Sequence, residues 1–193
     1  MRDSGDRQNR QGNVAFACLE DARVIYINGP IDDGLAYHFN TALLAFEYEN
    51  PHEDVTVYIN SPGGSVVSGL SMIDTMNLVA CDVTTVCVGM AASMGAMLLM
   101  SGTKGKRKIL PHSEVLIHQT LSTLSGTLQT TDLKNLADNA VRTRELLYNM
   151  ISEATGQPFS KIETDGERDY MMTAREALDY GIVDEIVTSH KKK

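Results

Sequence analysis

The chain has 193 residues, of which 42% are hydrophobic, and this is enough to bury the core of one domain. Its 17 basic and 25 acidic residues give a net charge of −8, which argues against nucleic acid as the main partner, because phosphate binding needs a basic surface. The three cysteines lack metal-ligand spacing, and no apolar stretch approaches the ~20 residues that span a bilayer, so we expect a cytoplasmic protein without a bound metal.

The first half of the chain alternates strand and helix patterns after a polar N-terminal arm. We assign residues 1–20 to this arm and residues 21–193 to a single domain. An apolar strand at 23–30 is followed by an amphipathic helix that begins after Asp32 and Asp33, and by a second strand at 55–60. This β-α-β order predicts a right-handed crossover and a parallel sheet.

Small residues follow two neighbouring strands of this sheet. Gly63 and Gly64 come after the second strand, and Ser93 and Met94 come after a third, at 83–88, where an apolar helix begins. Because the carboxyl ends of parallel strands lie at one edge of a sheet, the amides of Gly64 and Met94 would form a two-donor oxyanion hole beside Ser93. The alternative is that Ser93 is only a helix N-cap. The sequence is not a G-x-S-x-G elbow, because Ala91 stands two residues before the serine.

The second half begins with a basic, glycine-punctuated segment at 101–108, which we interpret as a solvated loop. The next strand, 114–119, carries His118 at its end, where a general base would be needed, although a structural histidine is the commoner case. Residues 121–131 predict an excursion outside the core. Thr131 and Asp132 then begin a long helical pattern that stops at Gly156. This helix has more apolar surface than one small sheet can cover, which predicts contact with another subunit.

The tail predicts a short helix at 158–162, a charged turn entering a short strand at 167–172, a capping box formed by Thr173 and Glu176, and a last strand at 182–187. Asp169 lies between the charged turn and the strand. As one of 25 acidic residues, it has no role assigned by its position alone.

Four ordered motifs carry a resemblance that covers nearly everything after about Asp21. They are Asn60-Ser61-Pro62-Gly63-Gly64, then Gly89-x-Ala91-Ala92-Ser93-Met94-Gly95, then Leu110-Pro111-x-Ser113 with Ile117-His118-Gln119, then Glu167-Arg168-Asp169 with Ala177-x-x-Tyr180-Gly181-x-Val183-Asp184. Together they resemble the proteolytic subunit of the Clp protease. The resemblance implies an α/β fold, the ββα spiral shared with crotonases, with a protruding strand-helix handle at about residues 119–154.

The resemblance also implies the chemistry of a serine endopeptidase that hydrolyses unfolded proteins. Ser93 would be the nucleophile, His118 the general base and Asp169 the carboxylate that orients the imidazole. The backbone N–H groups of Gly64 and Met94 would form the oxyanion hole, as the strand ends had suggested. No cofactor or metal is implied in this chain.

The family's assembly is two stacked seven-membered rings that form a tetradecamer and enclose the active sites. By resemblance, the N-terminal arm would be an axial segment. An AAA+ unfoldase of the ClpX, ClpA or ClpC type would use ATP to feed unfolded protein substrates into the chamber, without nucleic acid or membrane.

Several positions depart from the family pattern. Thr120, Ser122 and Thr123 stand where the handle usually carries a Gly-Gly pair, and Lys108 replaces an aromatic residue in the pocket that receives the ATPase loops. Such changes suit a divergent paralogue. Two alternatives are therefore a weakly active or structural ring subunit that needs a second Clp-type partner subunit, and a crotonase-like acyl-CoA enzyme with the same two-amide oxyanion hole.

Overall fold

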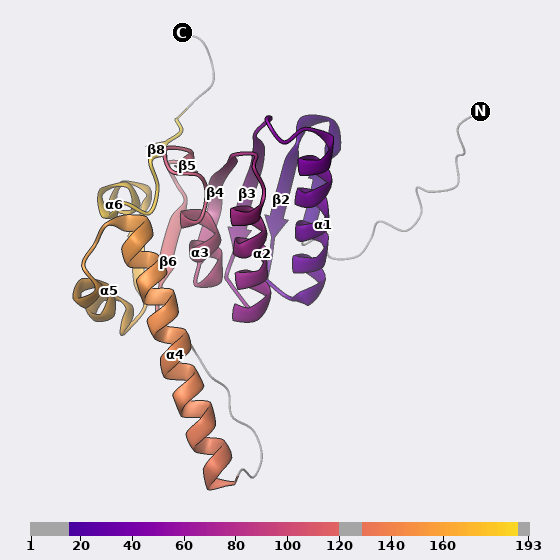
Figure 1. Cartoon of the computed structure of the whole chain (residues 1–193). Helices are drawn as coiled ribbons and strands as arrows, with labels where there is room; N and C mark the ends of the chain where they lie inside the picture. The colour runs from indigo at the N-terminus through magenta and orange to yellow at the C-terminus, as the bar shows by residue number, and fades with distance from the viewer. Residues whose placement is uncertain (1–15, 120–128, 189–193) are drawn as a thin grey trace.

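The computed structural model describes residues 16–119 and 129–188 (Figure 1). Its elements in chain order are β1 (Phe16–Leu19), a 3-10 helix η1 (Glu20–Ala22), β2 (Val24–Asn28), α1 (Asp33–Glu49), β3 (Val55–Ser61), α2 (Val66–Leu78), β4 (Val83–Ala92), α3 (Met94–Met100), β5 (Arg107–Ile109), β6 (Glu114–Ile117), α4 (Thr130–Thr155), α5 (Phe159–Gly166), β7 (Tyr170–Thr173), α6 (Ala174–Tyr180) and β8 (Glu185–Ile186).

The predicted β-α-β unit is confirmed. Strands β2, β3 and β4 are parallel neighbours, with α1 and α2 as the crossovers. Every second residue of β3, from Val55 to Ser61, is buried, because successive side chains of a strand point to opposite faces. Helix α1 begins where expected, since the carboxylate of Asp32 accepts a hydrogen bond from the amide of Leu35 at 2.8 Å.

Strand β4 changes its partner halfway along its length. Residues 85–87 pair with β5, whereas residues 90–92 pair with β6. Gly89 lies at the change with a φ of +86°, and its amide donates to Oγ of Ser113 at 2.8 Å. The prediction that this strand ends before Gly89 is wrong, because the glycine bends the strand without ending it. The change of partner brings β6 to the carboxyl end of β4.

Two further predictions from the sequence need correction. Residues 107–109 form β5, although the sequence indicated a solvated loop through residue 108. The reason is that Arg107 is buried and its charge is paired with Asp184. At the other end of the chain, β1 lies within the segment assigned to the arm and pairs antiparallel with β2, so the sheet begins before residue 21.

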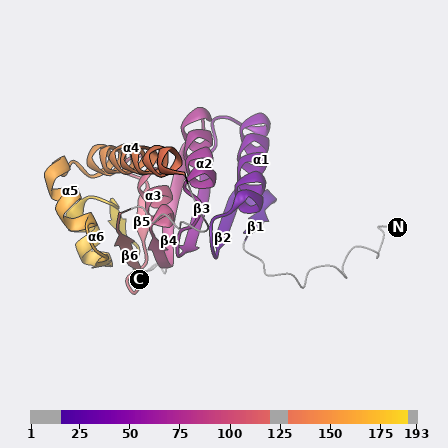
Figure 2. The same cartoon turned by 90° about the horizontal axis from the view of Figure 1, so that it is seen from below.

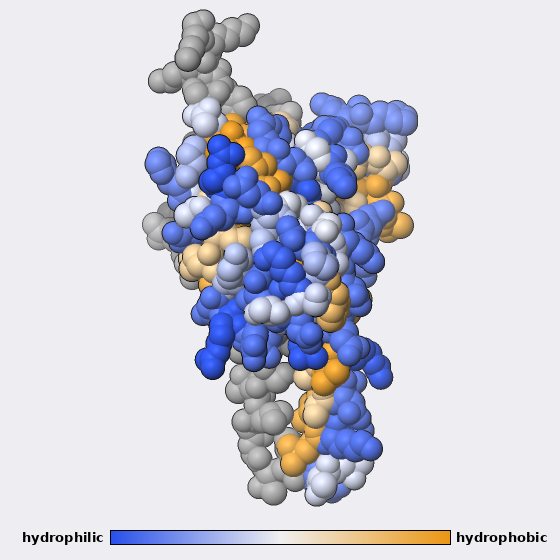
Figure 3. Space-filling view, turned by 90° about the vertical axis from the view of Figure 1, so that its left-hand side faces the viewer, coloured by the Kyte–Doolittle hydropathy of each residue, from blue (hydrophilic) through white to orange (hydrophobic). Residues whose placement is uncertain are grey.

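Helices α1, α2 and α4 lie on the same side of the sheet (Figure 2). Helix α4 is anchored through its C-terminal half, where Leu147, Tyr148 and Ile151 are buried, and its N-terminal half projects from the body. Figure 3 shows an apolar stripe along the projecting half.

The predicted cap at Thr131 and Asp132 is wrong, because α4 begins at Thr130. Residues 120–128, with most of the predicted excursion and the three handle substitutions, lie outside the described residues.

The C-terminal part keeps the predicted order of elements but not their lengths. The last strand, predicted at 182–187, is only Glu185–Ile186, and the helix predicted at 158–162 runs over Phe159–Gly166. Helix α4 stops at Gly156, which has the left-handed φ of 76° that glycine adopts freely. The capping box is confirmed, since Thr173 accepts from the amide of Glu176 and the carboxylate of Glu176 accepts from the amide of Thr173. Within the described ranges, no helix has the length and apolarity needed to cross a membrane.

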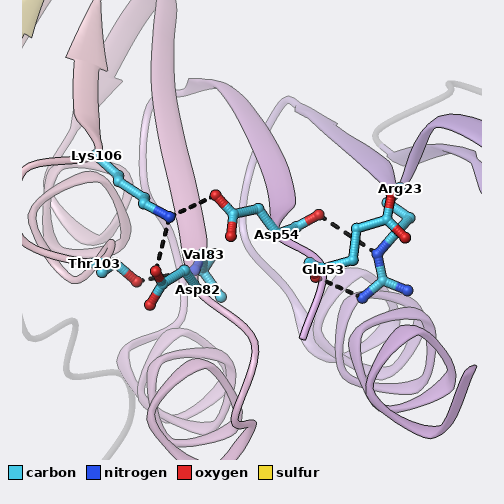
Figure 4. A network of polar contacts seen from close by, with 7 residues as sticks. All are labelled: Arg23, Glu53, Asp54, Asp82, Val83, Thr103 and Lys106. Atoms are coloured by element: carbon cyan, nitrogen blue, oxygen red, sulfur yellow. Dashed lines mark hydrogen bonds and ion pairs between the residues drawn. The ribbon is translucent and has the colours of Figure 1, made fainter. Parts of the chain in front are cut away.

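The amino ends of the central strands are held by a network of charged groups (Figure 4). Lys106 bridges Asp54 at 2.6 Å and Asp82 at 2.7 Å, the residues that precede β3 and β4. Arg23 is buried, and its guanidinium donates to the carbonyls of Phe46 at 2.9 Å and Glu53 at 2.9 Å, at the end of α1 and in the turn beyond it. These contacts fix the end of the sheet opposite to the predicted site.

A second charged group joins the sheet to the C-terminal segment. Asp184 accepts hydrogen bonds from the amides of Gly105 and Arg107 and from the guanidinium of Arg107, which also donates to the carbonyl of Ala154. Burial alone would raise the pKa of Asp184, but the hydrogen bonds from Arg107 outweigh it and hold the pKa below the ordinary 3.8. The carboxylate therefore stabilises the fold in its charged form.

Replacing this carboxylate should destabilise the protein. We expect Asp184→Asn to lower the free energy of unfolding by about 2 to 4 kcal/mol at pH 7, because it leaves Arg107 buried without its charge partner. Since the folded pKa is depressed, the difference from wild type should be complete above pH 3.8 and disappear as the pH falls through the folded pKa. Denaturant unfolding at several pH values measures it. Asp179→Asn, at an exposed and long ion pair, should change little.

Candidate active site

Ser93 occupies the corner between β4 and α3 in a strained conformation. Its φ of 53° and ψ of −121° are rare for a residue that carries a Cβ atom. Its amide donates to the carbonyl of Leu116 on β6 at 2.9 Å, but its side chain makes no capping hydrogen bond to α3. The N-cap interpretation therefore does not account for the serine. Strain at a strand-to-helix corner is typical of exposed catalytic serines.

The loop after β3 packs directly against this corner. A Cβ atom on Gly63, whose φ is +92°, would lie 2.7 Å from Cβ of Ser93 and 2.7 Å from the carbonyl oxygen of Ala92. Only glycine therefore fits at this position. The next residue, Gly64, forms an isolated bridge with Ile31. The glycine pair thus holds one backbone segment against the serine, as the parallel strand ends predicted.

One pocket brings most of the predicted site together. Gly64, Ser93, Met94 and His118 all line a cavity of about 250 Å³. The amide of Met94 is the first of α3 and so has no acceptor within its own helix, which leaves it available to an anion. The rest of the wall is mainly apolar, from Pro62, Val66, Met97, Ile117, Leu147 and Ile151.

His118 and Asp169 approach each other through the pairing of β6 with β7. The antiparallel register places Ile117 opposite Tyr170, so His118 and Asp169 are the next residues along the two chains. Asp169 is exposed and does not line the pocket. Across residues 16–119 and 129–188, no hydrogen bond joins Ser93 to His118 or His118 to Asp169. The catalytic triad therefore stays a prediction.

Arg144 and Tyr148 of α4 also line the pocket, and the sequence interpretation did not single them out. They share one helix face with Leu147 and Ile151, at spacings of three, four and seven residues. That spacing is the signal that could have found them. A sequence shows that such residues lie on one face, but not which pocket the face covers.

Cys87 is the thiol of β4, the strand that leads to the serine. Burial raises the pKa of this thiol to about 12, although a hydrogen bond with Ser113 opposes the rise. A thiol with such a pKa is neutral and a poor nucleophile at pH 7. In the part of the chain that the structure describes, no cluster of three or more His, Cys, Asp or Glu residues is arranged to hold a metal ion.

An α/β fold with a strained serine at the carboxyl edge of its sheet is typical of hydrolases that form an acyl-enzyme. A family model described as Clp protease matches residues 7–190. The ATP-dependent Clp protease proteolytic subunit of Porphyromonas gingivalis (strain ATCC BAA-308 / W83) is 45% identical over 189 residues, covering 96% of this chain and 84% of that protein. This chain belongs to the Clp protease family, and the predicted fold class is confirmed.

The backbone strain at Ser93 can be measured as stability. Ser93→Gly should be more stable than Ser93→Ala by about 1 kcal/mol, because glycine adopts the observed φ and ψ without a Cβ clash, and this gain exceeds its greater loss of chain entropy. Paired denaturant unfolding curves of the two variants test this, since both lack the hydroxyl. Equal stabilities would contradict the strained corner.

Proposed function

We propose that this chain is a serine endopeptidase, the proteolytic subunit of an ATP-dependent Clp-type protease that hydrolyses peptide bonds of unfolded proteins. Membership of the Clp protease family supports peptidase activity. The observation that carries the proposal is the strained Ser93, which shares one pocket with His118 and with the residues of the two predicted oxyanion donors, Gly64 and Met94.

In the proposed reaction, Oγ of Ser93 attacks the carbonyl carbon of the scissile bond while His118 accepts the hydroxyl proton. The negative charge on the tetrahedral intermediate lies between the N–H groups of Gly64 and Met94. His118 then returns the proton to the leaving amine, and the peptide bond breaks to leave an acyl-enzyme. Water, activated by the same histidine, hydrolyses the ester and releases Ser93.

Two contacts must form for this reaction, one from His118 to Ser93 and one from Asp169 to His118. His118 follows the end of β6 and Asp169 precedes the start of β7, and these two strand ends are paired. We therefore expect local changes of backbone and rotamer to bring the side chains together. Catalytic hydrogen bonds are often long in an unliganded site and tighten when substrate binds. Asp169 would then hold the imidazole in the tautomer whose other nitrogen faces Ser93.

The projecting half of α4 supports self-association. Three of its apolar side chains, Leu133, Leu136 and Val141, are between 42 and 48% exposed. Figure 3 shows apolar surface along this half, which a neighbouring subunit would cover. We propose heptameric rings stacked as a tetradecamer, as in the family. The cytoplasmic location stays a prediction.

A second pocket supports docking of an AAA+ unfoldase of the ClpX, ClpA or ClpC type, which would consume the ATP. Tyr58 and Lys108 line this cavity, whose volume is about 370 Å³, on the strand surface formed by β3, β4 and β5. Lys108 pairs with Glu185 at 3.4 Å, which places a charge pair where the family pattern has an aromatic residue. We expect the partner loop to be adapted to it.

The alternatives are less well supported. Family membership favours a peptidase over a crotonase-like acyl-CoA enzyme, which would share the oxyanion hole but has no need of Ser93. It also favours an active subunit over a purely structural one.

The central test is Ser93→Ala. This variant should lose labelling by a fluorophosphonate and lose peptide hydrolysis, because the nucleophile is absent, and it should keep the wild-type oligomeric mass. Intact mass and native mass spectrometry on the same sample measure labelling and assembly. Ser160→Ala, at an exposed serine of α5, is the control and should label fully. Peptide hydrolysis retained by Ser93→Ala would exclude the proposed nucleophile.

The role of Asp169 has a separate test. Asp169→Asn should slow fluorophosphonate labelling of Ser93 by about 10³-fold or more at pH 7, because the amide favours the wrong histidine tautomer. Its unfolding free energy should stay near that of wild type, since the carboxylate is exposed. Asp179→Asn removes an exposed carboxylate of α6 and should label normally. A wild-type labelling rate for Asp169→Asn would rule out the third member of the triad.

A further inference from the structure

Arg144 gives the mainly apolar active-site pocket a permanent positive charge. It lies on the pocket wall beside Leu147, Tyr148 and Ile151, the residues that anchor α4 to the body. Arg144 also lines an adjoining polar cavity, together with Gln119 beyond β6, Tyr148 of α4 and residues at the end of α5. It therefore stands between an apolar pocket that contains Ser93 and a polar cleft beside it.

The described part of the chain leaves one donor of this guanidinium without an acceptor. Nε of Arg144 is buried and has no hydrogen-bond partner among the described residues. One of its other nitrogens, Nη2, lies 3.7 Å from Oε1 of Glu163, which is beyond hydrogen-bond distance. Its carbon centre lies 6.0 Å from the centre of the Tyr148 ring, a weak cation–π contact that orients the side chain. A buried donor without an acceptor is rare in native proteins, so this nitrogen calls for a partner such as water, an ion or a ligand.

The missing partner has the chemistry of a carboxylate. Nε and an Nη atom of arginine form a planar fork that donates two parallel hydrogen bonds to the two oxygens of one carboxylate. Because Nε is buried in the unliganded pocket, the side chain must turn to present both nitrogens to an incoming carboxylate. Glu163 does not supply this geometry at its present distance, and its side chain is 52% exposed. It is close enough to keep the guanidinium in place and to compete weakly with an incoming anion.

We propose that Arg144 binds the carboxylate of an acidic side chain in the peptide, so that the enzyme prefers substrates with Asp or Glu near the scissile bond. The apolar wall of the pocket takes a neighbouring apolar side chain of the same peptide. This inference rests on the proposed function for the position of the scissile bond, but not for the binding itself. Arg144 is a specificity residue and takes no part in bond breaking.

The test uses pairs of peptides that differ only by Glu or Gln at one position. In successive pairs, this position is one or two residues before or after a fixed apolar residue. Binding is measured by fluorescence anisotropy on the Ser93→Ala assembly, and hydrolysis as kcat/KM on the wild type. We expect the Glu peptide to bind about tenfold more tightly than the Gln peptide at one of these positions. The kcat/KM ratio should follow, mainly through KM.

Variants on the Ser93→Ala background identify the residue responsible. Arg144→Gln should remove the preference for Glu, whereas Arg144→Lys should keep part of it, because lysine retains the charge without the fork. Glu163→Gln should increase the preference, since it removes the internal competitor. Arg142→Gln is the matched control, because Arg142 is exposed on the same helix and does not line the pocket. Each variant is checked for wild-type oligomeric mass.

The outcomes separate the inference from the proposed function. Equal binding of Glu and Gln peptides, or a preference that survives Arg144→Gln, overturns the inference even when hydrolysis is normal. A preference that depends on Arg144, in a protein whose Ser93 does not label, supports the binding site and contradicts the peptidase mechanism. A preference only for peptides with a free C-terminal carboxylate over their amides assigns Arg144 to the cleaved product and overturns recognition of an acidic side chain.

Discussion

The change of partner along β4 is the constraint on which the site depends. Up to Cys87 the strand pairs with β5, and from Met90 it pairs with β6. Ser113 holds the junction, because its hydroxyl accepts from the amide of Gly89 at 2.8 Å and donates to the carbonyl of Cys87 at 3.2 Å. Were β4 paired with β5 to its end, β6 would not reach Ala92, and His118 would not share a pocket with Ser93. A few buried hydrogen bonds therefore determine the geometry of the site.

The two ends of the sheet have different roles, because stabilising contacts gather at the amino ends of the strands and the strained serine lies at the carboxyl ends. At the amino ends, Lys106 and Arg23 satisfy carboxylates and carbonyls, and backbone geometry there is held by many favourable contacts. At the carboxyl ends, Ser93 keeps a φ of 53° that an isolated turn would relax. It persists because every residue of α3 is buried, so the helix that follows the serine cannot shift to relieve the strain.

Periodicity and local turn chemistry predicted much of this fold. What they missed depends on contacts between residues that lie far apart in the sequence. The β-α-β unit and the capping box at Thr173 depend on residues close in the chain, so they were visible in the sequence. Arg107 looked like a loop residue because its partner, Asp184, is 77 residues away. The structure places Ser93 and His118, both from the sequence motifs, in one pocket, while their catalytic roles stay predictions. The contribution of Arg144 could not be predicted, because a helix pattern does not reveal which surface its face covers.

Helix α4 serves both of the surfaces through which this protein is proposed to act. Its 26 residues include no proline or glycine, so the helix transmits displacement along its length without a hinge. Its projecting half exposes apolar side chains suited to another subunit, while its anchored half carries Arg144 and Tyr148 to the pocket of Ser93. A neighbour that tilts the projecting half therefore also moves the pocket wall. For this reason we expect peptide preference to depend on assembly.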